Sequence, residues 1–230
     1  MPYSKSKALQ QFELAVENLL ARCDECKSAK ISYDLKTLAF QGVILLTCSS
    51  LENYLKSLMD DWVFQLKSQQ ATMAHVPDKT RKILYVRNQS GLFKGFTFNG
   101  NENETSSKVK FNQFAFLLSN DSALVPSYMK GVHIYANKKY PSIDNIKKLF
   151  STLAIEDIFR VMHVKFKKNY SLYLESFLDV RESLAHEFPP DVSYADAKRQ
   201  VTNIRTLTRK IDSIAFAHLS KTSSKCYWPA

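Results

Sequence analysis

Residues 33–69 carry the longest continuous helical periodicity of this 230-residue chain, and this stretch limits the folds open to it. The centre of the stretch, residues 40–51, is mostly apolar or small on all sides. That composition is typical of a helix in the middle of a bundle. Only 5 glycines occur in the chain, which disfavours a turn-rich all-β fold. The sequence therefore predicts an all-α protein.

Apolar residues at steps of three and four predict the other helices. A first helix follows a cap at Ser4 or Ser6 and ends near Cys26. The later ones are expected over residues 143–153, 155–162, 170–188 and 194–219. Together with the helix over 33–69 they predict an antiparallel helical bundle.

The part of the chain between these helices has a weaker pattern. Residues 70–141 contain a polar run at 99–108 and a stretch at 131–141 that reads as extended. We expect a single domain over 1–230, in which 70–141 forms an inserted lobe that closes over a substrate or contacts a partner. Residues 220–230 read as a flexible tail.

The net charge of +10 favours a polyanionic partner, which can be RNA, DNA or an acidic protein. No stretch reaches the roughly 18 uninterrupted apolar residues of a membrane-spanning helix, and the first ten residues lack the apolar core of a signal peptide. The 4 cysteines form no regular framework, as in a reducing compartment. We expect a cytoplasmic protein without membrane association.

Cys23 and Cys26 have the C-x2-C spacing of zinc and redox sites. No second ligand pair follows for zinc, and a helix rather than a strand precedes the motif. We therefore interpret both as ordinary thiols and expect no metal and no cofactor. His75 and His133 are isolated, and we interpret them as structural or surface residues.

The most informative stretch is residues 170–190, a predicted helix that Pro189 and Pro190 should end near Phe188. Arg181 and His186 fall in its last turns. A histidine at a helix C-terminus is suited to proton transfer near neutral pH. A guanidinium presents a charged fork that matches phosphate oxygens. The pair suits metal-free phosphodiester chemistry.

The segment R-E-S-L-A-H at Arg181–His186 resembles the Arg-x4-His signature of HEPN domains, which are all-helical RNases of toxin–antitoxin, CRISPR-associated and phage-defence systems. Leu45–Lys56 resembles the early HEPN helix with its acidic position, here Glu52, and Ser193–Asp212 resembles the closing helix. The nearest type is the stand-alone RiboL-PSP HEPN protein. The resemblance implies a HEPN-like antiparallel bundle, a metal-independent endoribonuclease that works by 2′-OH attack, and a homodimer with a composite site.

The resemblance also implies roles for single residues. Arg181 and His186 would be catalytic, and Glu52 would orient one of them. On residue spacing alone, Glu52 can equally form a solvated pair with Lys56, four positions on. Glu182 departs from the pattern by adding negative charge beside a phosphate site. In place of the His-x-Tyr of HEPN toxins that are silenced by AMPylation, the chain has Phe188, which lacks a hydroxyl. A different antitoxin or regulatory protein remains possible as a partner.

Two sets of basic residues are candidates for RNA binding. Lys165, Lys167 and Lys168 surround Phe166, and basic residues interleaved with aromatics can hold a backbone and stack bases. Arg205 and Arg209 are expected on the outer face of the last helix, as a phosphate-binding face. In both cases an ordinary solvated basic face is the alternative.

Two other functions remain open on the sequence. One is a catalytically inactive HEPN-like module for dimerisation or RNA binding, in which Arg181 is neutralised by a neighbouring carboxylate. The other is a DNA-binding regulator, which rests on net charge alone because no helix-turn-helix is recognisable. An open site around His186 favours the enzyme, and a tightly salt-bridged Arg181 favours the module.

Overall fold

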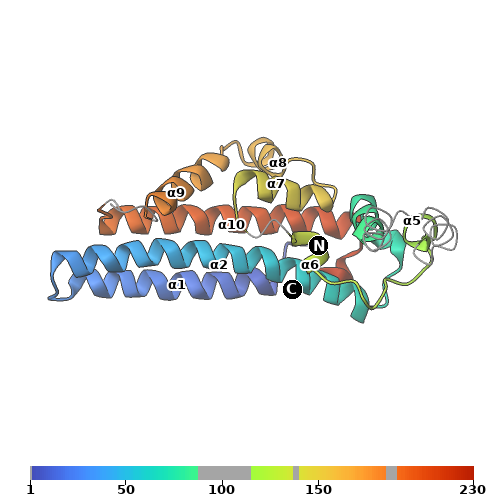
Figure 1. Ribbon diagram of the computed structural model, residues 1–230, viewed down its shortest axis with the longest axis horizontal. Coiled ribbons are helices and arrows are strands. Elements are labelled where there is room, and N and C mark those ends of the chain that lie inside the picture. Colours follow the sequence, from blue (N-terminus) through green and yellow to red (C-terminus); the bar gives the residue numbers. More distant parts are fainter. Residues whose placement is uncertain (1, 88–114, 137–139, 185–190) are drawn as a thin grey trace, which may run out of the picture.

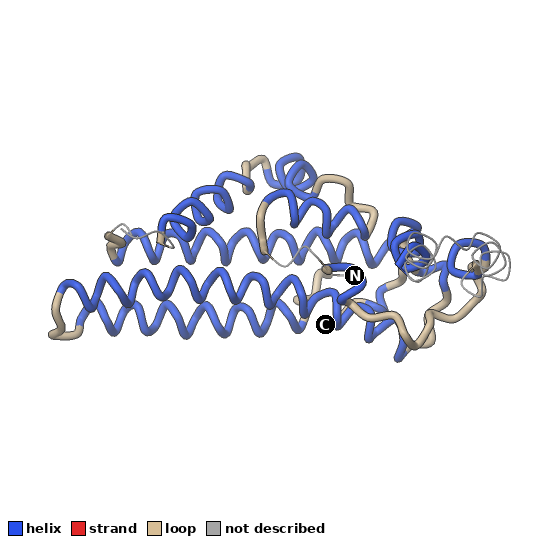
Figure 2. The backbone as a smooth tube through the Cα atoms, in the orientation of Figure 1, coloured by secondary structure: helices blue, strands red, loops and turns tan. Residues whose placement is uncertain are grey.

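The computed structural model describes residues 2–87, 115–136, 140–184 and 191–230. Its long axis is a hairpin of two helices, α1 (Lys7–Ser28) and α2 (Tyr33–Ser68), against which α10 (Tyr194–Thr222) packs lengthwise (Figure 1). Ser6, Ser32 and Ser193 begin these helices, each accepting a hydrogen bond from a backbone N–H three residues on. The described residues form helices and no strand, which confirms the all-α bundle (Figure 2).

Three shorter helices form a second layer over α10 and α2: α7 (Ile143–Thr152), α8 (Ile158–Phe166) and α9 (Ser171–Ser183) (Figure 1). Phe150 and Phe177 are fully buried in this layer, as are Tyr54 and Trp62 on α2. One continuous apolar core therefore holds the helices together.

The described part of 70–141 lies at the end of the bundle away from the α1–α2 turn (Figure 1). It contains the 3-10 turn η1 (Met73–His75), a helical stretch at 78–87, α5 (Phe116–Ser119) and α6 (Val132–Tyr135). Thr72 and Leu124 form an isolated antiparallel bridge. The helix α6 occupies part of the segment expected to be extended. The expected polar loop at 99–108 lies outside the described residues.

The C-terminal segment is packed, which differs from the flexible tail expected over 220–230. α10 continues to Thr222 and the turn η2 (Lys225–Tyr227) follows. Trp228 is 6% exposed, and its indole N–H donates to the carbonyl of Ser4 over 3.0 Å. Burial of the Tyr227 and Trp228 rings orders this C-terminal segment. Its other residues are mostly small or polar and by themselves suggest a loop.

The start of the chain is held by a buried carboxylate on α10. Asp212 accepts hydrogen bonds from the hydroxyls of Ser6 (2.5 Å), Tyr3 (2.6 Å) and Tyr54 (3.2 Å), and from the Ser6 N–H (3.2 Å). Burial nevertheless raises the pKa of Asp212 above its ordinary value. None of the helices that the structure describes is long and apolar enough to cross a membrane.

Candidate functional site

Arg181 lies in the last turn of α9. Leu174 and Phe177, on the inner face of this helix, are fully buried, so the helix is held firmly against the bundle. Arg181 follows Phe177 by four positions and is half-buried. Its partner in the motif, His186, lies outside the described residues, as do the flanking residues 185–190. The motif histidine therefore stays a prediction.

The Arg181 guanidinium is directed at two other elements. Its central carbon lies 5.2 Å from the centre of the Tyr140 ring, which precedes α7. Its charge also acts on Cys48 and Glu52, which are one helical turn apart on α2. Three segments that are distant in the sequence thus meet at this cation.

The groups around this cation are buried to different degrees: Cys48 is buried, whereas Glu52 and Tyr140 are half-buried. Burial raises the pKa of the Cys48 thiol to about 11, and it also raises the pKa of Glu52 and of Tyr140. The Arg181 charge opposes the shift in all three groups. Among the described residues no carboxylate forms an ion pair with Arg181. The Arg181 guanidinium contacts the Tyr140 ring, and the Glu52 carboxylate interacts with it only at longer range.

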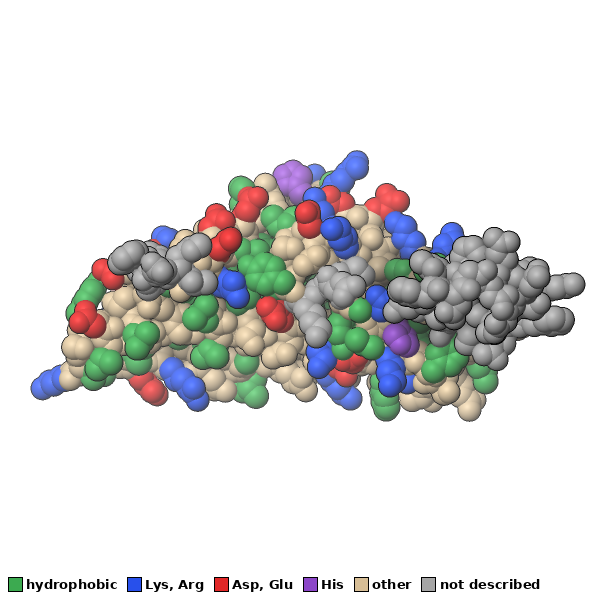
Figure 3. Space-filling model, viewed as in Figure 1, with side chains coloured by type: hydrophobic (Ala, Val, Ile, Leu, Met, Phe, Trp, Pro, Cys, Tyr) green, Lys and Arg blue, Asp and Glu red, His purple; other side chains and the backbone are tan. Residues whose placement is uncertain are grey.

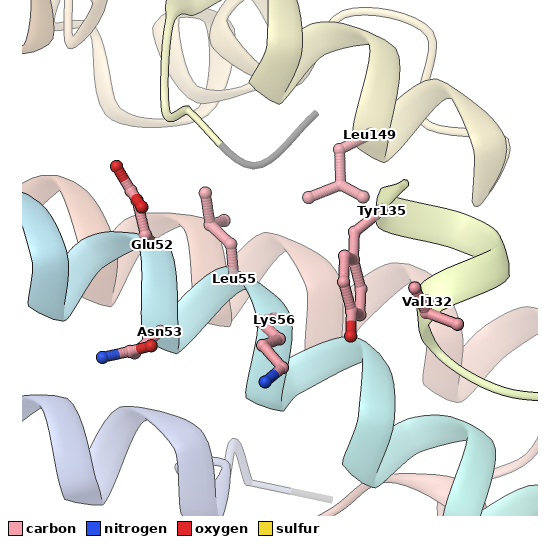
Figure 4. A pocket seen from close by; sticks show the side chains of 7 residues that line it. All are labelled: Glu52, Asn53, Leu55, Lys56, Val132, Tyr135 and Leu149. Carbon is pink, nitrogen blue, oxygen red and sulfur yellow. The ribbon is translucent and has the colours of Figure 1, made fainter. Parts of the chain in front are cut away.

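Glu52 also lines a cavity of about 220 Å³ between α2, α6 and α7 (Figure 4). Lys56 and Tyr135 line the same cavity, and the Tyr135 hydroxyl donates to Asp60 over 3.4 Å. Figure 4 shows the side chains of Glu52 and Lys56 pointing away from each other, and no ion pair joins these two described residues. The Arg181 charge acts on the pKa of Glu52 without an ion pair between these two described residues, so the orienting role of Glu52 stays a prediction.

Glu182 is exposed beside Arg181. Its charge acts on Tyr140, where it contributes to the raised pKa of the phenol. It forms no ion pair with another described residue. The structure thus puts a negative charge at the rim of the site, where it is screened by water.

Three basic residues gather where α8 meets α9. Lys165 lies 5.4 Å from the centre of the Phe166 ring, Lys168 lies 4.8 Å from that of Tyr173, and Lys167 occupies the left-handed position that ends α8. Lys210 of α10 reaches the Phe166 ring as well, at 4.4 Å. This basic-aromatic cluster lies at the opposite end of α9 from Arg181, roughly 20 Å away along the helix.

Arg205 and Arg209 differ from the expectation that they form an outward phosphate-binding face. Arg205 pairs with Glu17 and Arg209 pairs with Glu13, both on α1. Glu13 is only 8% exposed and also binds Lys5, and these cations lower its pKa against the effect of burial. The two arginines hold α10 on α1, because that face of α10 is turned towards a helix that supplies carboxylates.

Two contacts of Arg181 were not expected from the sequence. Cys48 is a small residue of the core and only 3% exposed, yet its thiol also meets the guanidinium. Its position one turn before Glu52 is the signal that could have found it. Tyr140 carries no such signal, since it precedes a proline in an irregular segment 41 positions before the motif arginine.

The described part of the chain is an all-helical bundle with an arginine in the last turn of α9, which agrees with the fold class that the resemblance implied. The family model described as RiboL-PSP-HEPN matches residues 15–215, so the chain belongs to this family. No curated protein and no solved structure matches the chain. The resemblance to the family is thereby confirmed, and the two segments that suggested it, residues 45–56 and 193–212, lie in α2 and in α10 with its N-cap.

Proposed function

We propose that this protein is an endoribonuclease of the HEPN type, which cleaves RNA without a metal and acts in the cytoplasm as a toxin or phage-defence effector. The membership in the RiboL-PSP-HEPN family supports this reaction class, since HEPN domains are often RNases. The net charge of +10 suits a polyanionic substrate.

In the proposed reaction the 2′-hydroxyl oxygen of one nucleotide attacks the adjacent phosphorus. The bond from phosphorus to the 5′-oxygen of the next nucleotide breaks, which leaves a 2′,3′-cyclic phosphate and a 5′-hydroxyl. His186 takes the proton from the 2′-hydroxyl or gives one to the leaving oxygen. Arg181 neutralises the negative charge that gathers on the phosphorane oxygens. No water is consumed in this step.

The observation that carries the proposal is the environment of Arg181. A guanidinium neutralised by a carboxylate has little charge left for a phosphate, whereas a ring leaves its N–H donors available. Arg181 faces the Tyr140 ring at 5.2 Å, and among the described residues it has no ion-pair partner. The guanidinium charge is therefore available to a phosphate oxygen.

Glu52 is proposed as the residue that positions Arg181, and Glu182 as a rim charge that repels misplaced phosphates. Lys165, Lys167 and Lys168 would hold the RNA backbone away from the cleavage point, with Phe166 and Tyr173 beside them for stacking. The active form would be a homodimer in which two copies of Arg181 and His186 form one composite site. An antitoxin or regulatory protein is a further possible partner in this proposal.

A second candidate is a catalytically inactive HEPN module for dimerisation or RNA binding. One specific observation favours it, namely the carboxylate of Glu182 directly beside Arg181 in the chain. A negative charge there lowers phosphate affinity through like-charge repulsion. The two candidates differ in one measurable property, the turnover of RNA.

The deciding experiment is incubation of purified protein with an RNA pool in EDTA, for the wild type, Arg181→Ala and His186→Ala. Arg160→Ala and His163→Ala are matched controls, because both residues are exposed on α8. We expect cleavage with cyclic-phosphate ends in the wild type and controls, and a loss of about 10²-fold or more in the two site variants. Folded protein that cleaves no RNA would support the inactive module. Cleavage that survives in both variants would place the site elsewhere.

A further inference from the structure

The outward face of the α1–α2 hairpin carries large hydrophobic side chains near its free end. Leu38 is 63% exposed, Leu35 54%, Leu46 52% and Leu45 43%. Ile31 and Tyr33 extend this surface to the turn between the helices. We call Leu35, Leu38, Gly42, Leu45 and Leu46 the leucine stripe. On the face shown in Figure 3, hydrophobic side chains recur along this hairpin.

The stripe is larger and less polar than an ordinary solvated helix face. Its four leucines, with Ile31 and Tyr33, are all more than 40% exposed, and a contiguous apolar patch of this kind on a monomer is often functional. α2 has no charged residue between Lys36 and Glu52, although part of this stretch faces outward. The expectation that residues 40–51 are buried on all sides is therefore met only in part, since the structure leaves one side open. A fully apolar centre indicates that something covers this side.

The spacing of the stripe identifies a helix as its natural partner. Residues 35, 38, 42, 45 and 49 follow alternating steps of three and four, which keep one seam of a helix turned towards a second helix. Large residues occupy 35, 38 and 45, and small residues occupy 42 and 49. Beyond Ser49 the same face turns polar, with exposed Asn53 and Lys56. The apolar seam thus has a defined end.

Gly42 has no role within the single chain that would explain it. A methyl group added at this position would meet no atom within 4 Å. Glycine inside a helix costs about 1 kcal/mol relative to alanine. The isolated chain gives no steric reason for this cost, whereas a glycine here would admit the close approach of another surface.

The stripe also adjoins the candidate site. Cys48 and Glu52 continue along α2 from Leu45, and both are reached by Arg181. α9 descends from α8 towards the free end of the hairpin, so that its last turn lies alongside the half of α2 that carries the stripe (Figure 1). A partner that covers the stripe consequently lies beside Arg181.

We propose that the leucine stripe binds the same stripe of a second copy, with the two α2 helices antiparallel and the two-fold axis between Gly42 and Leu45. In this register Gly42 lies opposite the partner's Leu45, and Ser49 lies opposite the partner's Leu38. Gly42 and Ser49 each receive a leucine from the other helix, which is the complementarity that a two-fold interface requires, and Leu35 lies opposite the partner's Glu52 at the polar end of the seam. The inference rests on the proposed function in one respect, because it assigns a surface to the dimer proposed there.

The interface is tested by charge substitution in the full chain. Leu38→Glu and Leu45→Glu should halve the mass measured by sedimentation equilibrium, while circular dichroism keeps the wild-type helix content. Phe64→Glu is the matched control, since Phe64 lies on the same helix and is also 63% exposed. A monomeric wild type, or stripe variants that stay dimeric, would overturn the inference.

The register is tested by disulfide cross-linking. In a Cys226→Ser background, which removes the exposed thiol, Gly42→Cys and Leu45→Cys chains are mixed and oxidised. We expect the mixed pair to cross-link at least tenfold faster than either variant with itself. Equal or faster cross-linking of Gly42→Cys with itself would reject this register.

A third variant separates the interface from the stability of the chain. Gly42→Ala should raise the melting temperature of the Leu38→Glu monomer, since alanine favours the helix. In the wild-type background the same change should weaken dimerisation about tenfold, and no weakening would contradict the close approach.

RNA cleavage is assayed in parallel. Dimers through the stripe without cleavage would refute the proposed nuclease alone, whereas cleavage without such dimers would refute only this interface.

Discussion

The Arg181 guanidinium carbon lies 5.2 Å from the centre of the Tyr140 ring, and this contact joins the end of α9 to the start of α7. An arginine on a ring keeps its fork of N–H donors available while its direction is restricted. The contact explains how a long side chain near a helix end keeps one orientation without a carboxylate bound to it.

Tyr140 should act through its ring and not through its hydroxyl. Tyr140→Phe should keep RNA cleavage close to the wild-type value. Tyr140→Ala should lower kcat/KM about 2- to 5-fold, as expected from roughly 0.5–1 kcal/mol for an exposed cation–π contact. Steady-state cleavage of a labelled RNA measures both. Equal losses in the two variants would assign the effect to the hydroxyl.

Glu52 should make stability depend on pH. Burial raises its pKa in the folded protein above the ordinary 4.5, so its contribution to stability is full below that pH and is lost as the pH rises through the folded pKa. Glu52→Gln should therefore melt higher than the wild type at pH 7, with the difference vanishing below about pH 4. Thermal melts over this range measure it.

Asp61→Asn is the matched control for Glu52→Gln, because burial also raises the pKa of Asp61 on the same helix. Both variants should gain stability at neutral pH. Only Glu52→Gln should slow RNA cleavage, by about tenfold, if Glu52 positions Arg181. An unchanged cleavage rate in Glu52→Gln would remove Glu52 from the site.

The basic-aromatic cluster should bind RNA through phosphate contacts. Lys165→Ala with Lys168→Ala should reduce the slope of log affinity against log salt by about 1.4, the value for two phosphates of a single strand. Lys79→Ala with Lys82→Ala is the control, since both lysines are exposed on the helical stretch at 78–87. Fluorescence anisotropy at several salt concentrations gives the slopes. Equal slopes for the two double variants would contradict a specific role for the cluster.

A composite site makes activity depend on both chains of the dimer. When wild type is mixed and re-equilibrated with Arg181→Ala, activity should fall with the square of the wild-type fraction, to about one quarter at equal amounts. Independent sites would give a linear fall to about one half. Arg160→Ala in place of Arg181→Ala should leave total activity unchanged.

Trp228 should contribute strongly to stability, because its side chain is buried and hydrogen-bonded. Trp228→Ala should lower the unfolding free energy by about 3 kcal/mol and the melting temperature by about 6–12 °C. Lys221→Ala, at an exposed position of α10, should change the melting temperature by less than about 1 °C. An unchanged melting temperature for Trp228→Ala would instead support the flexible tail that the sequence predicted over residues 220–230.

Sequence periodicity predicted the long helices well, because the pattern of α2 and the serine before α1 are local signals. α2 ends at Ser68, one residue before the predicted end, and Ser6 begins α1 as one of two expected caps. The same pattern wrongly predicted that the outer side of α2 is buried within the chain. An apolar residue gives the same sequence signal whether its own chain or another chain covers it.

The contacts of the candidate site were harder to predict because they join distant segments. Glu52 and Arg181 were expected together from the family resemblance, whereas Tyr140 was not expected at all. Arg205 and Arg209 appeared free because their partners, Glu17 and Glu13, lie nearly two hundred positions earlier. A local sequence pattern does not indicate that α1 supplies the carboxylates that face these arginines of α10.

The hydrogen bonds around Asp212 have a consequence for synthesis on the ribosome. Ser6 lies 206 positions before the carboxylate that holds it, and the N–H of Lys7 donates to the carbonyl of Pro229. The tertiary hydrogen bonds at the start of α1 therefore need residues that are translated about ten seconds or more later, at elongation rates of about 5–20 residues per second. A nascent chain can complete this packing of the N-terminal segment only after the segment around Trp228 has emerged.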